Sequence, residues 1–383
     1  MRRPPPIGPR ILRAFATIRD LMSESRFAPL LRTDLAELHS YEPRPGTFAV
    51  RLDANESPPL LSPEAAAELA RAMVPESYNR YPDARTTALR EAIAEHAGAS
   101  PDEILVGTGS DEVIALLLTA LDRPQGKNPA PTLLVPTPTF VMYRQSARAR
   151  GFKVVEVPLD ATWDLEVSSM RTAIEIMRPN VIFIATPNNP TSRLVSLDRL
   201  EAVITAAPDA LVIVDEAYVD FASRTQIDLR KKHPNVAVLR TLSKIGFAAL
   251  RVGWLIAPAE LVRELDKVRQ PYNVPVPSQR GATFVLRELR DEMARMRAEV
   301  IAERARLAEG LEKLGFAVTP SDANFLWTEA PRPANELVEA LAARGVLVKG
   351  YGASGGRLLR RMRITVGLPA ENDRLLYEIA QCT

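Results

Sequence analysis

The chain has 383 residues, of which 49 are basic and 47 acidic, so its formal net charge at pH 7 is only +2. This balance argues against a nucleic-acid-binding surface or an anionic membrane surface. No stretch approaches the roughly 18 uninterrupted apolar residues of a membrane span. The single cysteine, Cys382, allows neither an internal disulfide nor a cysteine metal site, which fits a reducing compartment such as the cytoplasm.

The length predicts about two domains, preceded by an N-terminal extension and arm over residues 1–50. The first 20 residues are basic and rich in proline but contain no continuous apolar segment, which argues against a secretory signal. The three histidines, His39, His96 and His233, lie too far apart to form a metal-ligand spacing, so no metal site is expected.

From about residue 50, short apolar runs alternate with helix-like segments. Residues 103–109 (EILVGTG) form one such run, and Ser110 and Asp111 then begin a segment whose apolar positions repeat at helical spacing. Further runs are TLLVP, VVEVPL, VIFIATP, LVIVDEAY and VAVLRTLS. Nearly continuous apolar strands between helices predict a parallel sheet covered on both faces. Functional groups of such α/β sheets gather beyond the carboxyl ends of the strands.

We assign residues 51–275 to this large domain and residues 276–383 to a smaller α+β domain. Residues 270–282, which contain three prolines, are predicted to be a junction. Residues 287–315 predict one long amphipathic, solvated helix, because arginine and glutamate alternate there with alanine, leucine and methionine. Residues 316–367 then predict a strand, a helix and a strand.

Lys244 lies in an otherwise small and apolar stretch, residues 240–258 (RTLSKIGFAALRVGWLIAP). The chain contains eight lysines and 41 arginines, so a lysine at this place is notable. Lysine, unlike arginine, readily loses its proton and attacks a carbonyl carbon. On this stretch alone, however, a solvated lysine at a strand end is the simpler interpretation.

Five motifs at successive strand ends change that interpretation: GTGSDE (107–112), PTPTFVMY (136–143), TPNNPTS (186–192), DEAYVDF (215–221) and TLSK (241–244). Each is weak alone, but their order and spacing resemble the fold type I pyridoxal-phosphate enzymes, in the branch of histidinol-phosphate aminotransferase. The resemblance extends from residue 41 to residue 367. It implies an α/β fold of the aspartate-aminotransferase type, with a mostly parallel sheet in the large domain, and pyridoxal 5′-phosphate as cofactor.

The resemblance assigns the chemistry to three residues. Lys244 attaches to the cofactor aldehyde and later, as a free amine, moves a proton from the substrate α carbon. Asp215 pairs with the pyridine nitrogen and keeps it protonated, so that the ring accepts electrons. Tyr218, together with Asn189, hydrogen-bonds the phenolic oxygen of the cofactor.

The resemblance also implies how the cofactor is anchored. Six residues are expected to bind its phosphate: Gly109, Ser110, Asp111, Thr241, Ser243 and Arg251. The first three open a helix whose amides bind anions, and Arg251 adds a permanent planar charge. Phe140 stacks on the cofactor ring. Tyr81 reaches the phosphate of the neighbouring subunit, which implies a homodimer with shared active sites.

For the substrate, Arg363 matches the arginine that binds the α-carboxylate, and Asn55 and Tyr41 match residues on the substrate side. Lys349 stands where the family has an arginine that holds the substrate phosphate. Three neighbouring arginines could take this role instead: Arg357, Arg360 and Arg361. Two further departures from the family pattern are Ser192, at a position that is usually glycine, and a spacing from Lys244 to Arg251 that is one residue short.

We therefore expect histidinol-phosphate:2-oxoglutarate aminotransferase activity, in histidine biosynthesis, on small amino-acid and 2-oxo-acid substrates. Two alternatives share the cofactor residues: an aromatic amino-acid aminotransferase and a threonine-phosphate decarboxylase. A regulator with an aminotransferase-like domain would need a DNA-binding module, and the roughly 40 residues before the matched region are too few and too rich in proline for one.

Overall fold

The computed structural model describes residues 26–33, 35, 38, 40, 42 and 44–382. The chain divides into two compact units, residues 1–46 and residues 47–383. The described part of the first unit includes the short 3-10 turn η1 (Ala28–Leu30). Tyr41, which was predicted to touch the substrate, lies outside the described residues. All that follows concerns the second unit.

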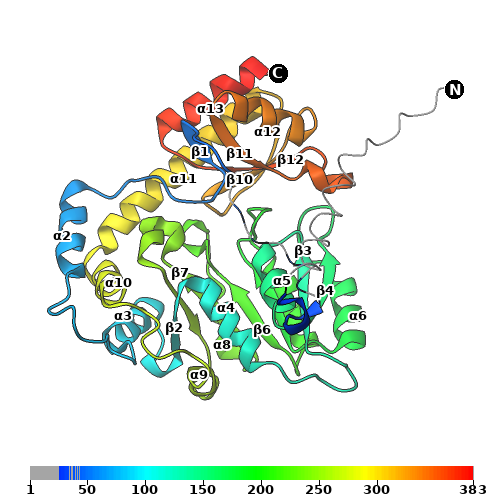
Figure 1. The fold of residues 1–383 in the computed structure, drawn as a ribbon. Helices are drawn as coiled ribbons and strands as arrows, with labels where there is room; N and C mark the ends of the chain where they lie inside the picture. Colours follow the sequence, from blue (N-terminus) through cyan, green and yellow to red (C-terminus); the bar gives the residue numbers. More distant parts are fainter. Residues whose placement is uncertain are drawn as a thin grey trace. The chain divides into compact units, whose positions relative to one another are not determined.

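A seven-stranded sheet with the order β2-β8-β7-β6-β5-β3-β4 forms the larger part of this unit (Figure 1). Strands β3 to β7 run parallel, whereas β8 is antiparallel to both β2 and β7. The mostly parallel sheet predicted from the sequence is thus confirmed. The strands are β2 (Ile104–Thr108), β3 (Thr132–Thr137), β4 (Lys153–Pro158), β5 (Val181–Ala185), β6 (Leu211–Asp215), β7 (Val236–Thr241) and β8 (Val252–Ile256).

Both faces of this sheet are buried, because alternate residues of each central strand contribute to two separate cores. Ile182 and Ile184 of β5 belong to one core, and Val181 and Phe183 to the other. The first core includes α3 (Thr87–Ala97), α6 (Val167–Met177), α7 (Leu197–Ala206) and α10 (Val276–Glu288). The second includes α4 (Gly109–Ala120), α5 (Val141–Arg148) and α9 (Ala259–Asp266). Burial on both faces explains the nearly continuous apolar strands.

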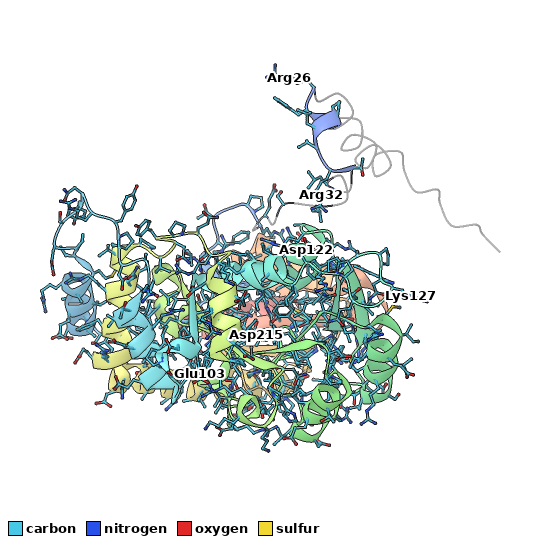
Figure 2. The ribbon with its side chains drawn as sticks, turned by 90° about the horizontal axis from the view of Figure 1, so that it is seen from below. Arg26, Arg32, Glu103, Asp122, Lys127 and Asp215 are labelled. Atoms are coloured by element: carbon cyan, nitrogen blue, oxygen red, sulfur yellow. The ribbon has the colours of Figure 1, made fainter. Side chains whose placement is uncertain are left out.

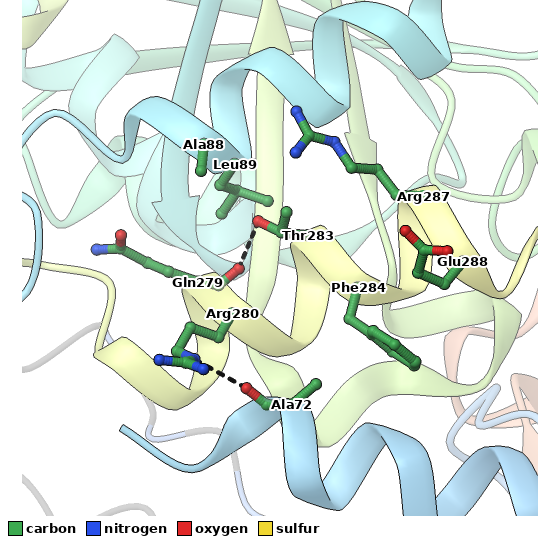
Figure 3. A pocket seen from close by; sticks show the side chains of 9 residues that line it. All are labelled: Ala72, Ala88, Leu89, Gln279, Arg280, Thr283, Phe284, Arg287 and Glu288. Atoms are coloured by element: carbon green, nitrogen blue, oxygen red, sulfur yellow. Dashed lines mark hydrogen bonds between the residues drawn. The ribbon is translucent and has the colours of Figure 1, made fainter. Parts of the chain in front are cut away.

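The prediction of a junction over residues 270–282 is wrong for its second half, because α10 already begins at Val276. Pro277 lies in the first turn of this helix, where the missing N–H of proline costs no hydrogen bond. The helix packs on α3 and on α2 (Pro63–Met73). Arg280 Nε donates to the Ala72 carbonyl at 2.9 Å beside a hollow of about 350 Å³ between these helices (Figure 3).

The single helix predicted over residues 287–315 is two helices, since the backbone leaves the helical conformation at Leu289 (φ −105°, ψ 27°). The second helix, α11 (Arg290–Lys313), is also less solvated than predicted. Its first half packs Met293, Met296 and Val300 into the core of the large sheet. Its second half adds Leu307 and Leu311 to a different core, so α11 connects the two.

A five-stranded sheet with the order β1-β11-β12-β10-β9 forms the rest of the unit (Figure 1). Its apolar core lies on one face, under α11, α12 (Ala334–Ala343) and α13 (Pro369–Cys382). The predicted strand, helix and strand were incomplete, because four strands come from this region and a fifth comes from the start of the unit. The strands are β1 (Val50–Leu52), β9 (Ala317–Thr319), β10 (Phe325–Glu329), β11 (Val346–Gly350) and β12 (Arg361–Thr365).

Short helical turns connect these elements. They are η3 (Pro101–Glu103), η4 (Val219–Phe221), α8 (Leu229–Lys232), the π-helical η5 (Ser243–Phe247), η6 (Ala248–Leu250), η7 (Gly352–Ser354) and η8 (Gly356–Leu358). In the part of the chain that the structure describes, no helix is both long enough and apolar enough to cross a membrane.

Candidate active site

The carboxyl ends of β5, β6 and β7 lie side by side, because these three strands are parallel neighbours. β6 ends at Asp215 and β7 at Thr241, and the segment 186–192 follows β5. Backbone bonds fix the first residues beyond the strands: Thr186 N–H donates to the Asp215 carbonyl at 2.8 Å. Three of the five sequence motifs therefore meet at one edge of the sheet, as predicted.

Lys244 lies in η5, directly after β7, and its side chain is half-buried. All seven other lysines, each within the described residues, are exposed. The Lys244 Nζ lies 5.7 Å from the centre of the Tyr218 ring, and its carbonyl accepts from Ser57 Oγ at 3.0 Å. No ion pair to Nζ occurs within residues 44–382. Lys244 is thus the one lysine that is partly shielded from solvent, and no carboxylate within residues 44–382 forms an ion pair with it.

Asp215 is only 4% exposed and lies inside the folded unit, whereas Lys127 lies at its periphery (Figure 2). Burial raises the pKa of the Asp215 carboxyl to about 6. Two hydrogen bonds oppose this shift, from the Tyr143 hydroxyl to Oδ2 at 2.5 Å and from the Ala217 N–H to Oδ1 at 2.9 Å. At neutral pH the carboxyl is therefore ionised, although it titrates far above a solvated aspartate.

Tyr143 was not singled out from the sequence, although it ends the motif PTPTFVMY. The available signal was its position three residues after Phe140, since residues three apart lie on one side of a helix. The half-buried Phe140 ring meets the Tyr143 ring edge-on, with 5.4 Å between centroids.

Tyr218 and Asn55 are in direct contact, since Asn55 Nδ2 donates to the Tyr218 hydroxyl at 3.0 Å. Asn55 is 1% exposed and has a left-handed backbone (φ 55°), a conformation that asparagine adopts more readily than most residues. Its backbone is held by Thr365 Oγ1 and by Asn324 Nδ2, at 3.0 and 3.2 Å. Sequence reasoning missed these last two residues, which come from the far end of the chain.

Arg363, in the middle of β12, is 9% exposed and points to the end of β5. Its Nη1 donates to Asn189 Oδ1 at 2.7 Å, and its Nη2 donates to the Asp53 carbonyl. Nε is buried and has no partner among the described residues. Arg363 and Asn189 are both predicted site residues, and the structure brings them together from the two sheets.

Gly109, Ser110 and Asp111 form the first turn of α4, next to Arg251. A Cβ atom at Gly109 (φ 78°) would lie 2.6 Å from Arg251 Nη2, so the guanidinium lies against bare backbone. The Arg251 carbonyl accepts from Gly109 N–H at 2.9 Å, and its Nη2 lies 3.9 Å from Asp111 Oδ2. Arg251 has a left-handed backbone (φ 51°), and its side chain reaches the first turn of α4 despite the short spacing from Lys244.

This cradle fits an anion such as a phosphate group. The first turn of the helix supplies backbone amides beyond that of Gly109, which is already bonded to Arg251, and a positive potential, and Arg251 supplies a cation. The hydroxyl groups of Thr241 and Ser243 lie 2.9 Å apart at the end of β7. Gly253 of β8, which was not predicted, lets β8 lie close to the first turn of α4, since a Cβ there would lie 2.4 Å from the Ser110 nitrogen.

Two further predicted residues, Tyr81 and Lys349, are exposed. Tyr81 is 80% exposed, and its ring stacks on Tyr272 with 4.6 Å between centroids. Lys349 is exposed on β11, directly opposite Arg363 of β12. Residues directly opposite each other on antiparallel strands project from the same face of the sheet. Lys349 and Arg363 therefore share the face that α11, α12 and α13 leave uncovered.

The three arginines proposed as alternatives to Lys349 are engaged elsewhere. Arg357 donates to the carbonyls of Leu159 and Asp160, at 2.8 and 2.6 Å, and its guanidinium lies 3.7 Å from the centre of the Trp163 ring. The other two, Arg360 and Arg361, both pair with Glu329.

Comparisons with known proteins agree with this geometry. Residues 49–379 match the family model described as aminotransferase class I and II. Histidinol-phosphate aminotransferase of Methylibium petroleiphilum is 43% identical over 355 residues, which cover 92% of this chain and 94% of that protein. The enzyme of the same name from Chromobacterium violaceum is 41% identical, with coverage of 91% and 97%.

A solved structure supports the fold. Histidinol-phosphate aminotransferase from Sinorhizobium meliloti, in complex with pyridoxal-5′-phosphate, superposes with a TM-score of 0.78 at 23% identity, covering 88% of this chain and 92% of that one. The predicted fold type is confirmed. From the family match and the close relatives, the chain belongs to the class I and II aminotransferases.

Proposed function

We propose that this protein is a pyridoxal-phosphate-dependent aminotransferase that exchanges an amino group between histidinol phosphate and 2-oxoglutarate. The observation that carries the proposal is Lys244: the one lysine that is not exposed lies at the carboxyl end of β7, close to Tyr218. The names of the relatives at 41–43% identity support histidinol phosphate as the amino substrate.

The cofactor residues fit pyridoxal phosphate. The first turn of α4 and Arg251 hold its phosphate, because they form a cradle that a Cβ at Gly109 would fill. When bound, the cofactor supplies an aldehyde that joins to amines and a ring that withdraws electrons from the substrate α carbon. Lys244 provides the amine that holds the cofactor, and then takes and returns the proton at the substrate α carbon.

Asp215 would accept a hydrogen bond from the protonated ring nitrogen of the bound cofactor. Its pKa of about 6 leaves it ionised at pH 7, so it can stabilise a positive charge on that nitrogen. The cost of keeping a buried carboxylate ionised is offset only when a cation or donors face it. A protonated pyridine nitrogen supplies such a partner.

Tyr218 and Asn189 would donate hydrogen bonds to the phenolic oxygen of the bound cofactor. The Tyr218 oxygen already accepts from Asn55 Nδ2, so its own proton is available to a ligand. The Asn189 Oδ1 already accepts from Arg363, so its NH₂ group is available in the same way. Asn55 therefore leaves the hydroxyl proton of Tyr218 free for the cofactor, and Arg363 does the same for the NH₂ group of Asn189.

Arg363 binds the α-carboxylate of the amino substrate. Its Nε is buried without a partner among the described residues, and Nη1 and Nη2 each retain one N–H beyond their bonds to Asn189 and Asp53. A planar guanidinium can bind a carboxylate through two parallel hydrogen bonds.

Lys349 binds the substrate phosphate in this proposal. It projects from the same face of the small sheet as Arg363, and it forms no ion pair within residues 44–382. The neighbouring arginines are already bound to carbonyls or to Glu329, so using them would require breaking those contacts.

The active protein is a cytoplasmic homodimer, in which Tyr81 reaches the cofactor phosphate of the partner subunit. The support is the exposure of the segment between α2 and α3: Tyr81 is 80% exposed and Tyr78 is 86% exposed. Large exposed aromatic side chains are enriched at protein interfaces. We also propose a large domain over residues 51–275 and a small one over residues 276–383. The two separate sheets support such a division, although β1 belongs to the smaller sheet, and α10 and the first half of α11 pack in the core of the larger one.

The proposal is tested with the purified protein loaded with pyridoxal phosphate. Glutamate alone should convert the cofactor to its amine form and release one equivalent of 2-oxoglutarate per site. A decarboxylase would instead release carbon dioxide from its own amino acid and keep the aldehyde form. Histidinol phosphate should then exceed histidinol and phenylalanine in kcat/KM, and a clear preference for phenylalanine would indicate an aromatic aminotransferase.

A further inference from the structure

We propose that Tyr143 is a positioning residue for Asp215, which holds the carboxylate ionised and correctly turned toward the cofactor nitrogen. The inference rests on the proposed function, because that function places Asp215 opposite the ring nitrogen. Tyr143 itself does not touch the cofactor in this assignment and acts only through Asp215.

The Tyr143 hydroxyl has a fixed position because its ring is clamped. The side chain is 1% exposed and stacks on Phe183 of β5, with centroids 4.7 Å apart and planes 19° apart. The Phe140 ring packs edge-on against the Tyr143 ring, with 5.4 Å between centroids. The hydroxyl then lies 2.5 Å from Asp215 Oδ2. The packing of the Tyr143 ring against Phe183 and Phe140 therefore fixes the hydroxyl where it donates to Asp215, at the end of β6.

The two oxygens of Asp215 have separate donors. Oδ2 accepts from Tyr143, and Oδ1 accepts from the backbone N–H of Ala217 at 2.9 Å. One donor on each oxygen fixes the plane of the carboxylate, and a carboxylate has further lone pairs for a third donor. Tyr143 is the one side-chain donor to Asp215 among the described residues.

The charges around Asp215 make this donor important. Asp111 and Glu216 raise the pKa of Asp215, although Glu216 is itself paired with Arg240 at 2.7 Å. The hydrogen bond from Tyr143 acts in the opposite direction and lowers that pKa. Burial and the nearby Asp215 charge raise the pKa of Tyr143 well above its usual range, so its hydroxyl stays protonated and remains a donor.

Tyr143→Phe removes only the hydroxyl and preserves the stacking on Phe183. We expect the full-length variant to bind pyridoxal phosphate up to about 10-fold more weakly at pH 7, because loss of this hydrogen bond raises the pKa of Asp215 and leaves much of the carboxyl protonated. The acid limb of its kcat/KM profile should move to higher pH, because Asp215 then protonates more easily. Tyr377→Phe, an exposed tyrosine on α13, is the matched control and should change neither quantity.

A double-mutant cycle separates this role from a purely structural one. In the Asp215→Asn background, Tyr143→Phe should leave the dissociation constant of pyridoxal phosphate unchanged, because no carboxylate remains to be held. An equal loss in both backgrounds would overturn the proposal, as would wild-type affinity and an unshifted acid limb in Tyr143→Phe.

A measurement on the cofactor-free, full-length protein keeps the inference distinct from the proposed function. The ¹³Cγ signal of Asp215, identified by its absence in Asp215→Asn, should titrate near pH 6 in the wild type and at higher pH in Tyr143→Phe. An unshifted signal would refute the effect of Tyr143 on Asp215. Failure of the wild type to bind pyridoxal phosphate, in contrast, would refute the proposed function whatever this signal does.

Discussion

Arg363 on β12 donates from Nη1 to Asn189 Oδ1 at 2.7 Å, which joins the small sheet to the segment after β5 of the large sheet. Arg363 is assigned to the substrate carboxylate and Asn189 to the cofactor. The contact therefore connects the two binding functions through a single hydrogen bond, and a change at Arg363 should affect both.

Arg363→Lys should lower kcat/KM for amino substrates by about 100-fold, because lysine cannot hold Asn189 and a carboxylate in the two-pronged geometry of arginine. Steady-state kinetics with glutamate measures this loss. Arg51→Lys, an exposed arginine on β1 of the same sheet, is the control and should retain wild-type activity. Unchanged kinetics in Arg363→Lys would contradict the carboxylate assignment.

Lys349→Ala should weaken kcat/KM for histidinol phosphate by about 10- to 150-fold and leave phenylalanine turnover unchanged, because one charge-assisted hydrogen bond to the phosphate is lost. Arg360→Ala is the matched control, since that cation is already paired with Glu329. If Arg360→Ala proves selective for the phosphorylated substrate and Lys349→Ala does not, the assignment must be exchanged.

Ser192→Gly should stabilise the protein by about 1 kcal/mol. Ser192 has a left-handed backbone (φ 61°), and its buried Oγ has no hydrogen-bond partner among the described residues. Glycine removes both penalties and adds only the entropy of a more flexible unfolded chain. Chemical denaturation measures the change. Ser192→Ala removes the hydroxyl but keeps the strained backbone, so a gain as large as that of glycine would show that the relief of backbone strain does not exceed the entropy cost of glycine.

Asp215→Asn should change how the stability of the cofactor-free protein depends on pH. The pKa of Asp215 is raised from 3.8 to about 6 by burial, so the folded state keeps this proton to higher pH than the unfolded state does. The group's contribution to stability is therefore present below pH 4 and is lost as pH rises to about 6. Relative to the wild type, the variant should gain up to about 3 kcal/mol between pH 4 and pH 7. If the free energy of unfolding depends on pH in the same way for the wild type and the variant, Asp215 titrates like an ordinary aspartate.

The strand ends and their motifs were predictable because each is local. An apolar run, a polar residue and a turn fall within about ten residues, and the parallel sheet then brings the ends of β5, β6 and β7 together. The positions of Lys244 and Asp215 at the ends of β7 and β6 were predicted in this way, whereas their chemical roles were predicted from the family resemblance.

Contacts between distant segments were not predictable from such patterns. β1 pairs with β11 across almost 300 residues, and no local feature of VRL at residues 50–52 reveals its partner. In the same way, no local sequence feature distinguishes Arg357 from other basic residues. Its contacts with Trp163 and with the carbonyls of residues 159 and 160 exist only in the folded structure. The break at Leu289 was also hidden, because the helical periodicity continues through it.

The central claim, that Lys244 holds the cofactor, is tested most directly by borohydride reduction of the protein loaded with pyridoxal phosphate, followed by peptide mapping. We predict one equivalent of cofactor fixed on the peptide that contains Lys244, and none in Lys244→Arg, which keeps the charge but has no attacking amine. Fixation on any of the other seven lysines, or equal fixation in Lys244→Arg, would contradict the account.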